Sequence, residues 1–383
     1  MKVTLIGTLP PIKALSPYCY HLAVALSKKV DLDFINFKSI LPELWYVGGS
    51  REKKSYSFDK FSSVDLLSWY NPFSLIKAGL SAKGQIVHFQ HWQLYASMMY
   101  CFILPILKIR GKKIIVTVHN ITPHTLDYPS RLLDKILNSI IFPFADHIII
   151  HNKRNKKKLQ NLYKVEDENI SILPHGSIMP YQKIKNIDKK NARNHLKIPM
   201  DKKIILFFGY MWTYKGLDVL LKALSIIKEE KNDIALLIAG QPRADWQKFE
   251  KIIRKNSLEN FVIKHLKFID DSETEHYFSA SDLVVLPYYE NPFDTHGGVG
   301  ALAISFKKPL VVTDVGGLPE YVKDERVISQ PNNPENLAKK IIFVLNDEKL
   351  MDKLSKDSEV LSKELNWDDI AENTVEIYNR LLK

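Results

Sequence analysis

Cysteine is scarce in this 383-residue chain, which holds only Cys19 and Cys101. Two cysteines cannot build a disulfide framework or a cysteine-rich zinc site, so the fold must be held together by buried apolar side chains. The composition, 45% hydrophobic and 25% charged residues, is that of a soluble globular protein, and the length predicts two to three domains. The low cysteine content also predicts a reducing, cytoplasmic environment.

Long apolar runs are missing as well. The longest one, residues 98–107, contains Pro105 and is much shorter than the roughly 20 residues that a membrane-spanning helix needs, so it predicts a buried helix. The apolar N-terminal segment, residues 3–9, stops at Pro10 and Pro11, which predicts a first buried strand rather than a signal peptide.

Strand-like and helix-like segments alternate along the whole chain, a pattern typical of α/β proteins with parallel sheets. The predicted strands are residues 2–6, 32–37, 86–89, 113–118, 147–151, 203–208, 234–239, 261–268, 283–287 and 310–313. The predicted helices include residues 18–28, 128–142, 217–228, 335–345 and 350–365. The first strand ends in Gly7-Thr8-Leu9, without the Gly-x-Gly-x-x-Gly pattern, which argues against a nicotinamide-dependent dehydrogenase.

The alternating pattern breaks once, near Pro174-His175-Gly176, before a polar, lysine-rich stretch at residues 182–203. We therefore predict two doubly wound, Rossmann-like domains, residues 1–190 and 200–365, with a cleft between them and a closing helix at residues 366–383. Ligands of such sheets bind outside the carboxyl ends of the strands, so functional residues are expected in the loops that follow strands.

Acidic residues are few in the first half of the chain. Residues 1–200 hold 29 Lys and Arg against 13 Asp and Glu, a balance of +16, whereas the remaining residues hold 25 against 30, a balance of −5. A basic half fits an anionic membrane surface, a lysine-rich solvated face without a partner, or nucleic acid. The basic clusters at residues 108–113 and 152–158 lack interleaved aromatic residues, and no nucleic-acid-binding motif is present, so nucleic acid is the least favoured partner.

A glycine-opened helix is the most informative feature of the second half. Residues 297–306 are predicted to form a short helix that begins at Gly297 and Gly298, between the strands at residues 283–287 and 310–313. Backbone N–H groups at a helix start have no intrahelical partner, and the helix dipole adds partial positive charge there, so this segment can bind an anion such as a diphosphate.

Three other strand ends carry polar residues. The loop at residues 208–216 places Lys215 before a helix, where it can reach a phosphate or lie on the surface as most lysines do. Gly240 and Gln241 end the next strand, as a ligand contact or a tight turn. In the first half, His119 follows the strand at residues 113–118 and either contacts a substrate or fastens its own loop.

Taken together, these segments resemble a family-4 glycosyltransferase of the GT-B architecture over nearly the whole chain. The resemblance is carried by residues 282–287, 308–320, 209–216 and 172–176, by His119, and by the helix that begins at Trp367. It implies two Rossmann-like domains and a C-terminal helix that crosses back to the first domain.

The resemblance also implies a reaction: transfer of a hexose, with retention of configuration, from a nucleotide sugar such as a GDP- or UDP-hexose, with neither a metal nor a further cofactor. Lys215 would neutralise the donor diphosphate, and the backbone of Gly297, Gly298 and Val299 would donate hydrogen bonds to it. His119 would contact the transferred sugar. The other donor-binding residues would be Gly209, Tyr210, Gln241, Glu290 and His296.

The chain departs from the family pattern at two places. The family carries two glutamates seven residues apart; Asp294 stands at the first position and Leu302 at the second, where the family's carboxylate holds the ribose. Glu290 is the rival for the first acidic role, although the spacing to the glycine-opened helix favours Asp294. In the loop at residues 208–216, which resembles the family's donor-phosphate loop, Tyr210 replaces a common arginine.

Other functions remain open from the sequence alone. The acceptor would be lipid-linked, a glycan or a small molecule, and the basic half suggests a protein peripheral to the cytoplasmic face of a membrane. A catalytically silent nucleotide-sugar-binding protein fits the loss of the second carboxylate, and a GT-B-type epimerase or phosphorylase shares the scaffold. Asp31-Leu32-Asp33 matches a metal-binding Asp-x-Asp, but it lies near the start of a predicted strand, away from the ligand-binding ends.

Overall fold

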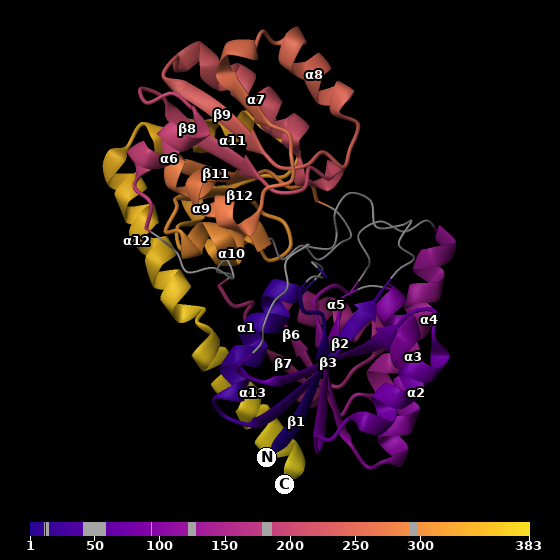
Figure 1. Ribbon diagram of the computed structural model, residues 1–383. Helices are drawn as coiled ribbons and strands as arrows, with labels where there is room; N and C mark the ends of the chain where they lie inside the picture. The colour runs from indigo at the N-terminus through magenta and orange to yellow at the C-terminus, as the bar shows by residue number, and fades with distance from the viewer. Residues whose placement is uncertain are drawn as a thin grey trace. The chain divides into compact units, whose positions relative to one another are not determined.

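The computed structural model describes residues 1–10, 12, 15–40, 59–92, 94–121, 128–177, 186–290 and 298–383. The chain forms two compact units, one of Met1–Gly176 with Leu365–Lys383 and one of Ser177–Glu364 (Figure 1). The last segment therefore returns to the first unit, as the sequence predicts. The two units divide after Gly176, before the lysine-rich stretch at residues 182–203. Within that stretch, Lys189–Leu196 form a helix that belongs to the second unit.

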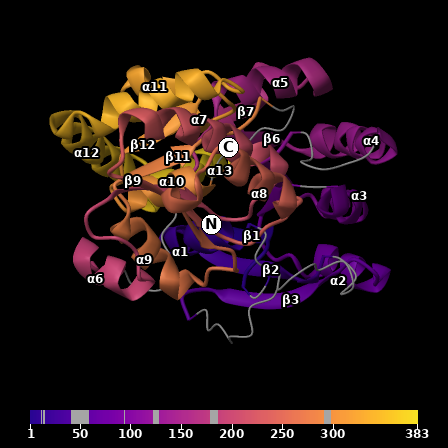
Figure 2. The same cartoon turned by 90° about the horizontal axis from the view of Figure 1, so that it is seen from above.

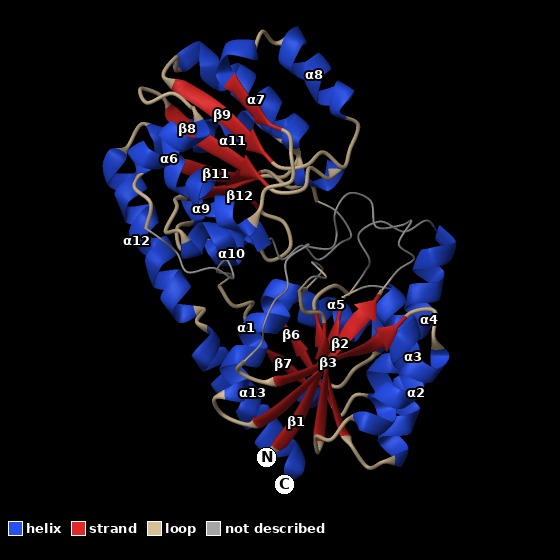
Figure 3. Cartoon of the chain, viewed as in Figure 1, coloured by secondary structure: helices blue, strands red, loops and turns tan. Residues whose placement is uncertain are grey.

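The first unit is built on a parallel sheet of seven strands (Figure 3). The strands are β1 Lys2–Gly7, β2 Asp31–Ser39, β3 Ser62–Ser68, β4 Ile86–His91, β5 Lys113–Val118, β6 His147–Ile150 and β7 Ile170–Ile172. Their order is β3-β2-β1-β4-β5-β6-β7, with β1 pairing with both β2 and β4. The strand order reverses between β1 and β4, and such a reversal opens a ligand-binding crevice at the carboxyl ends of these strands.

Helices cover both faces of this sheet, and two apolar cores result. Its helices are α1 Ser16–Ser27, α2 Pro72–Ser81, α3 Leu94–Ile109, α4 Tyr128–Phe144, α5 Lys153–Tyr163 and α13 Trp367–Leu382. Side chains of α2, α3 and α4 share one core with Ile6, Val87 and Phe89, whereas α1 and α13 share the other with Leu5 and Phe34. Because strand side chains alternate between faces, neighbouring residues such as Leu5 and Ile6 enter different cores.

The second unit repeats the architecture with six parallel strands. They are β8 Lys203–Phe208, β9 Ile234–Ala239, β10 Val262–His265, β11 Leu283–Leu286, β12 Leu310–Thr313 and β13 Ile328–Ser329, in the order β10-β9-β8-β11-β12-β13. Its helices are α6 Lys189–Leu196, α7 Leu217–Glu230, α8 Trp246–Lys255, α9 Asp271–Ala280, α10 Gly298–Ser305, α11 Pro334–Leu345 and α12 Glu348–Glu364. Every residue of β9, β11 and β12 is buried, which explains why these strands read as unbroken apolar runs.

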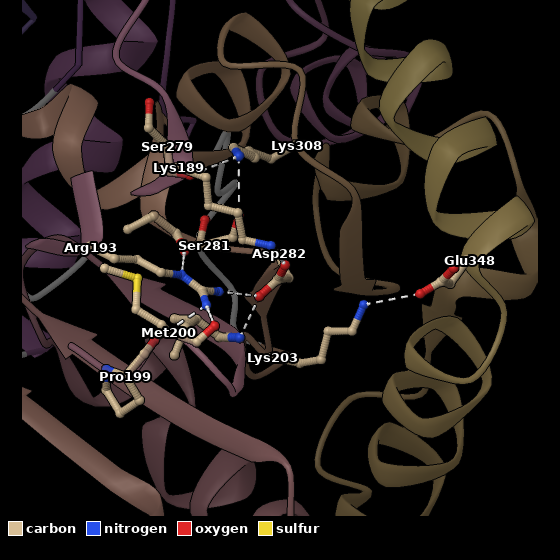
Figure 4. A network of polar contacts seen from close by, with 12 residues as sticks. Lys189, Arg193, Pro199, Met200, Lys203, Ser279, Ser281, Asp282, Lys308 and Glu348 are labelled. Carbon is tan, nitrogen blue, oxygen red and sulfur yellow. Dashed lines mark hydrogen bonds and ion pairs between the residues drawn. The ribbon is translucent and has the colours of Figure 1, made fainter. Parts of the chain in front are cut away.

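A buried aspartate fastens α6 to this sheet (Figure 4). Asp282 directly precedes β11, and its carboxylate accepts hydrogen bonds from Arg193 Nη2 (2.7 Å) and from the backbone N–H of Ile204 (2.6 Å), and also from Lys189. Arg193 Nε donates to the carbonyl of Ala280 at 3.0 Å. Asp282, the first residue of the family-like segment 282–287, therefore has a structural role at the amino edge of the sheet.

Candidate functional site

The loops that leave β8 and β9 lie against each other at the carboxyl edge of the second unit's sheet. The N–H of Gly209 donates to the carbonyl of Ala239 at 2.9 Å, and the N–H of Met211 donates to that of Gln241 at 3.0 Å. Gly209 and Gly240 both have positive φ, +93° and +148°. A Cβ on Gly240 would lie 2.0 Å from the Gly209 oxygen, so only glycine allows this approach.

Lys215 lies above Gly209 with its ammonium group buried. It ends the 3₁₀ turn Thr213–Lys215, is 6% exposed, and places Nζ 3.4 Å from the carbonyl oxygen of Phe208 and 5.9 Å from the centre of the Tyr288 ring. A Cβ on Gly209 would lie 3.0 Å from Nζ. Burial lowers the Lys215 pKa to about 8.

No carboxylate of the described residues forms an ion pair with Lys215. A buried ammonium group usually has an anionic partner, because its desolvation is costly. A carbonyl oxygen and an aromatic ring provide only partial compensation. The arrangement therefore has the properties of a site that binds an anion.

The loop after β11 lies against the start of α7, next to Lys215. Gly216, with φ +69°, caps that helix, and a Cβ on it would lie 1.9 Å from the carbonyl oxygen of Pro287. The N–H of Tyr289 donates to the carbonyl of Tyr214 at 2.8 Å, and the Tyr289 hydroxyl donates to Asp218. The loops after β8, β9 and β11 thus meet at one edge, where the sheet geometry predicts ligand binding.

The start of α10 reaches the same place. Val299 is buried, and its Cγ2 would lie 3.5 Å from a Cβ on Gly209, close to the Lys215 ammonium. The N–H groups of the first turn, including those of Gly298 and Val299, have no acceptor within the helix. Leu302, at the position of the family's second carboxylate, is half-buried in α10.

Three residues of the predicted donor site, Asp294, His296 and Gly297, lie outside the described residues. Glu290 is described and is exposed. The choice between Asp294 and Glu290 for the acidic role therefore stays a prediction.

Arg243 is a cation that the sequence analysis missed. Its guanidinium carbon lies 4.8 Å from the centre of the Tyr210 ring, and Nη2 is 3.4 Å from the Gln241 side-chain oxygen. The N–H of Arg243 also donates to the carbonyl of Met211 at 3.3 Å. Tyr210, which replaces the family's arginine, thus stacks against Arg243. In the sequence, Arg243 is marked only by its position shortly after a strand.

In the first unit, His119 follows β5 and has both ring nitrogens in hydrogen bonds. Nε2 lies 2.9 Å from the side-chain oxygen Oε1 of Gln90, and Nδ1 lies 3.1 Å from Nε2 of His151. The ring of Tyr18 contacts His119 edge to face, with 4.4 Å between centroids. His119 is only 4% exposed, so a sugar that bonds to Nε2 has to displace the Gln90 amide.

These groups belong to a longer buried chain of hydrogen bonds. His151 Nδ1 lies 3.0 Å from the carbonyl oxygen of Leu173 at one end, and His88 Nδ1 lies 2.6 Å from the Tyr378 hydroxyl at the other. Gln90 joins the two halves, with 3.3 Å to Nε2 of His88. All of these side chains are essentially inaccessible to solvent.

The Leu173 carbonyl, at one end of these hydrogen bonds, determines which ring nitrogens carry protons. Because the Leu173 oxygen can only accept, His151 donates from Nδ1, and a neutral His151 then accepts at Nε2 from His119 Nδ1–H. Neutral His119 in turn accepts at Nε2, which requires the NH₂ group of Gln90 there. The structure places Oε1 of Gln90 at that position, 2.9 Å away, so this assignment rotates the amide by 180°. The opposite orientation of the Gln90 amide requires an extra proton on His151, a charge on a fully buried ring.

Two groups of residues have the composition of metal ligands. Asp33 accepts a hydrogen bond from Thr4 Oγ1 (2.9 Å), and Asp31 pairs with Lys2 (3.3 Å), both at the amino end of β2 and away from the strand ends that carry the other site residues. His195, Glu273 and His276 hold their ligand atoms within 4.8 Å of one another on α6 and α9. There, His195 Nε2 is 2.7 Å from Glu273, and the two imidazoles are stacked.

Known proteins resemble this chain in sequence over part of its length. Residues 188–360 match the family model described as glycosyl transferases group 1. An uncharacterised glycosyltransferase of Methanocaldococcus jannaschii is 28% identical over 241 residues, which cover 60% of this chain and 59% of that protein. The D-inositol 3-phosphate glycosyltransferase of Corynebacterium glutamicum is 23% identical over 66% of this chain and 62% of its own. The chain thus spans less than two thirds of the length of these relatives.

Solved structures resemble it over the full length. Sucrose-phosphate synthase from Thermosynechococcus elongatus has a TM-score of 0.73 at 18% identity, covering 100% of this chain and 99% of its own. HepE from Anabaena, in complex with UDP-glucose, has a TM-score of 0.73 at 14% identity, covering 99% and 100%. At such low identities the likeness concerns the fold alone, and it confirms the predicted GT-B class.

Proposed function

We propose that this chain, whose residues 188–360 match the family model of the glycosyl transferases group 1, transfers a hexose from a nucleoside diphosphate sugar to an acceptor. The observation that carries the proposal is the buried Lys215 ammonium, which lies above a glycine and has no carboxylate partner among the described residues. A donor diphosphate supplies the missing negative charge. The Anabaena neighbour binds UDP and UDP-glucose, which supports a UDP-hexose, and a GDP-hexose is the alternative donor.

The proposed chemistry is stabilisation of the leaving group. As the bond between the sugar and the diphosphate breaks, negative charge accumulates on the diphosphate oxygens. Lys215 and the first N–H groups of α10, those of Gly298 and Val299, oppose that charge from fixed positions. Such preorganised donors do the work that a metal ion does elsewhere, so we propose a metal-independent reaction. Retention of configuration is part of the proposal because the family resemblance implies it.

We assign the sugar contact to His119. With the Gln90 amide rotated by 180°, as the neutral hydrogen-bond chain requires, its Nε2 carries a lone pair and accepts a hydrogen bond from a sugar hydroxyl in place of Gln90. We assign further donor contacts to Tyr210 and Gln241, which follow β8 and β9, with Asp294 or Glu290 as the acidic residue. The acceptor is a lipid-linked, glycan or small molecule, and the basic first half of the chain favours one presented at the cytoplasmic face of a membrane.

A panel of nucleotide sugars tests the proposal. Thermal shift identifies the donor, and transfer or slow hydrolysis of that donor is then measured. We expect Lys215→Met to weaken donor binding strongly, His119→Ala to weaken it less, and Lys308→Met to leave it unchanged. Lys308 is the matched control, because burial lowers its pKa to about 8 as well, but it precedes β12 at the opposite edge of the sheet.

A catalytically silent donor-binding protein is the second candidate, favoured by Leu302 at the position of the missing carboxylate. It predicts the same thermal shifts without turnover. Failure of every nucleotide sugar to bind contradicts both functions.

A further inference from the structure

The outer surface of α4 is apolar, although its inner surface is polar. Leu132, Leu133, Ile136 and Ile140 are exposed to solvent at spacings of about one helical turn. Asp134 and Asn138, in contrast, are buried and bonded to each other. Asn138 also bonds to His91 and Ser97 within the unit. An amphipathic helix normally presents the opposite arrangement, so the exposed side of α4 is suited to an apolar environment.

The two helices next to α4 extend this apolar surface. On α2, Phe73, Ile76 and Leu80 occupy one side of the helix, and Phe73 is 79% exposed. On α3, Phe102 is 64% exposed, and Met98 lies one turn before it. These helices pack on the same core, α2 beside α3 and α3 beside α4 (Figure 2). The exposed apolar side chains of α2, α3 and α4 are called here the α2–α4 surface.

Charge on the α2–α4 surface has one sign. Between Asp65 and Asp127 the sequence contains no acidic residue but six lysines and arginines. Lys77 lies beside Ile76 and Leu80 on α2, and Lys135 lies beside Ile136 on α4, both exposed. The acidic residue of α4, Asp134, points into the protein. Exposed apolar side chains among cations alone are the composition of helices that lie in the interface of an anionic bilayer.

We propose that the α2–α4 surface docks on anionic lipid, with its apolar side chains in the headgroup region and its lysines on lipid phosphates. A second copy of the chain fits poorly, because a symmetric contact would bring the same cations together. No helix in the described part of the chain can cross a bilayer, so docking is peripheral. The inference does not depend on the proposed transfer reaction.

Flotation of the full-length protein with vesicles tests the proposal. Phosphatidylcholine vesicles with and without phosphatidylglycerol are compared at low and high salt. We expect the protein to float with anionic vesicles at low salt and to be released by high salt, because screening weakens the attraction to lipid phosphates. Failure to float with anionic vesicles at low salt overturns the proposal.

Variants assign the binding to this surface. The triple variant Phe73→Ser, Phe102→Ser, Ile136→Ser should bind anionic vesicles about tenfold more weakly than the unmodified protein. The double variant Lys77→Gln with Lys135→Gln should also lower binding. The control, Phe343→Ser with Val360→Ser, changes exposed apolar side chains of the second unit and should float like the unmodified protein. Thermal unfolding checks that all variants fold.

The proposal is overturned if the triple variant floats like the control. It is also overturned if sedimentation shows a dimer that the triple variant dissociates while lipid binding is unchanged. Nucleoside diphosphate binding, measured on the same variants, reports on the donor site separately.

Discussion

At the scale of single residues, burial of the Lys215 ammonium group destabilises the folded protein. Its pKa falls from 10.5 to about 8 through burial, which corresponds to about 3 kcal/mol of destabilisation at pH 7. Below pH 8 the lysine is charged in both the folded and the unfolded protein, and the full cost applies. Above about pH 10.5 it is neutral in both, and the cost disappears.

Lys215→Met should therefore stabilise the unliganded protein. We expect the free energy of unfolding at pH 7 to rise by about 1–3 kcal/mol, because the desolvation cost is removed and only weak contacts are lost. The gain should shrink as the pH rises above about 8, where the unmodified lysine loses its proton in the folded state. Denaturant unfolding of the second unit at several pH values measures this, and a less stable variant at pH 7 would assign Lys215 a structural role.

Sequence reasoning located Gly209 and Lys215 because both follow a readily recognised apolar strand. It could not locate Arg243, whose stacking on Tyr210 depends on two loops that pair only in the folded sheet. His151 was missed for the same reason, since its contact with His119 joins residues 32 positions apart.

At the scale of elements, α10 is held by a close contact between Gly300 and Tyr321. A Cβ on Gly300 would lie 2.4 Å from Cδ2 of the buried Tyr321 ring. The helix can therefore approach this ring only through a residue without a side chain. Its position in turn sets where the N–H groups of Gly298 and Val299 point.

Gly300→Ala should displace α10 and weaken nucleoside diphosphate binding. We expect a loss of about 1–3 kcal/mol in stability, typical of overpacking, together with lower donor affinity. Tyr321→Leu in the same chain creates room and should restore part of both. Thermal unfolding and calorimetric titration measure the two effects; an alanine variant with unchanged stability and affinity would show that this contact does not position the helix.

The central strands and the edge strand β10 were predictable, whereas the edge strands β3, β7 and β13 were not. The strands β8, β9 and β12 are buried on both faces, so their apolar runs are continuous. The edge strand β3 buries only its last two residues and contains three serines, so its pattern resembles a loop. The strand β7, at the other edge, has three residues, too few for a periodic signal.

At the scale of the molecule, the C-terminal helix α13 completes the first unit. Ile370, Ala371 and Ile377 are buried in the core shared with α1, and Tyr378 ends the hydrogen-bond chain that contains His119. Its amphipathic pattern predicts a helix, but periodicity alone cannot say which unit it packs on. The family resemblance supplied that placement, and the structure confirms it.

Ile370→Ala should lower the stability of the first unit and leave the donor site unaffected. Truncation of this buried side chain costs about 2–5 kcal/mol in a well-packed core. Hydrogen exchange followed by mass spectrometry should show faster exchange in β1, α1 and α13, while exchange in β8 and β9 and nucleoside diphosphate affinity stay unchanged. Equal loss of protection in both units would contradict the assignment of α13 to the first.

The central claim, that Lys215 binds the donor diphosphate, is tested most directly by proton uptake. UDP and GDP are titrated by calorimetry at about pH 8.5, above the Lys215 pKa of about 8, in two buffers that differ in ionisation enthalpy. A bound diphosphate raises the lysine pKa, so binding should take up protons in the unmodified protein and in Lys308→Met, and none in Lys215→Met. Binding by Lys215→Met with the same affinity and the same proton uptake would contradict the account.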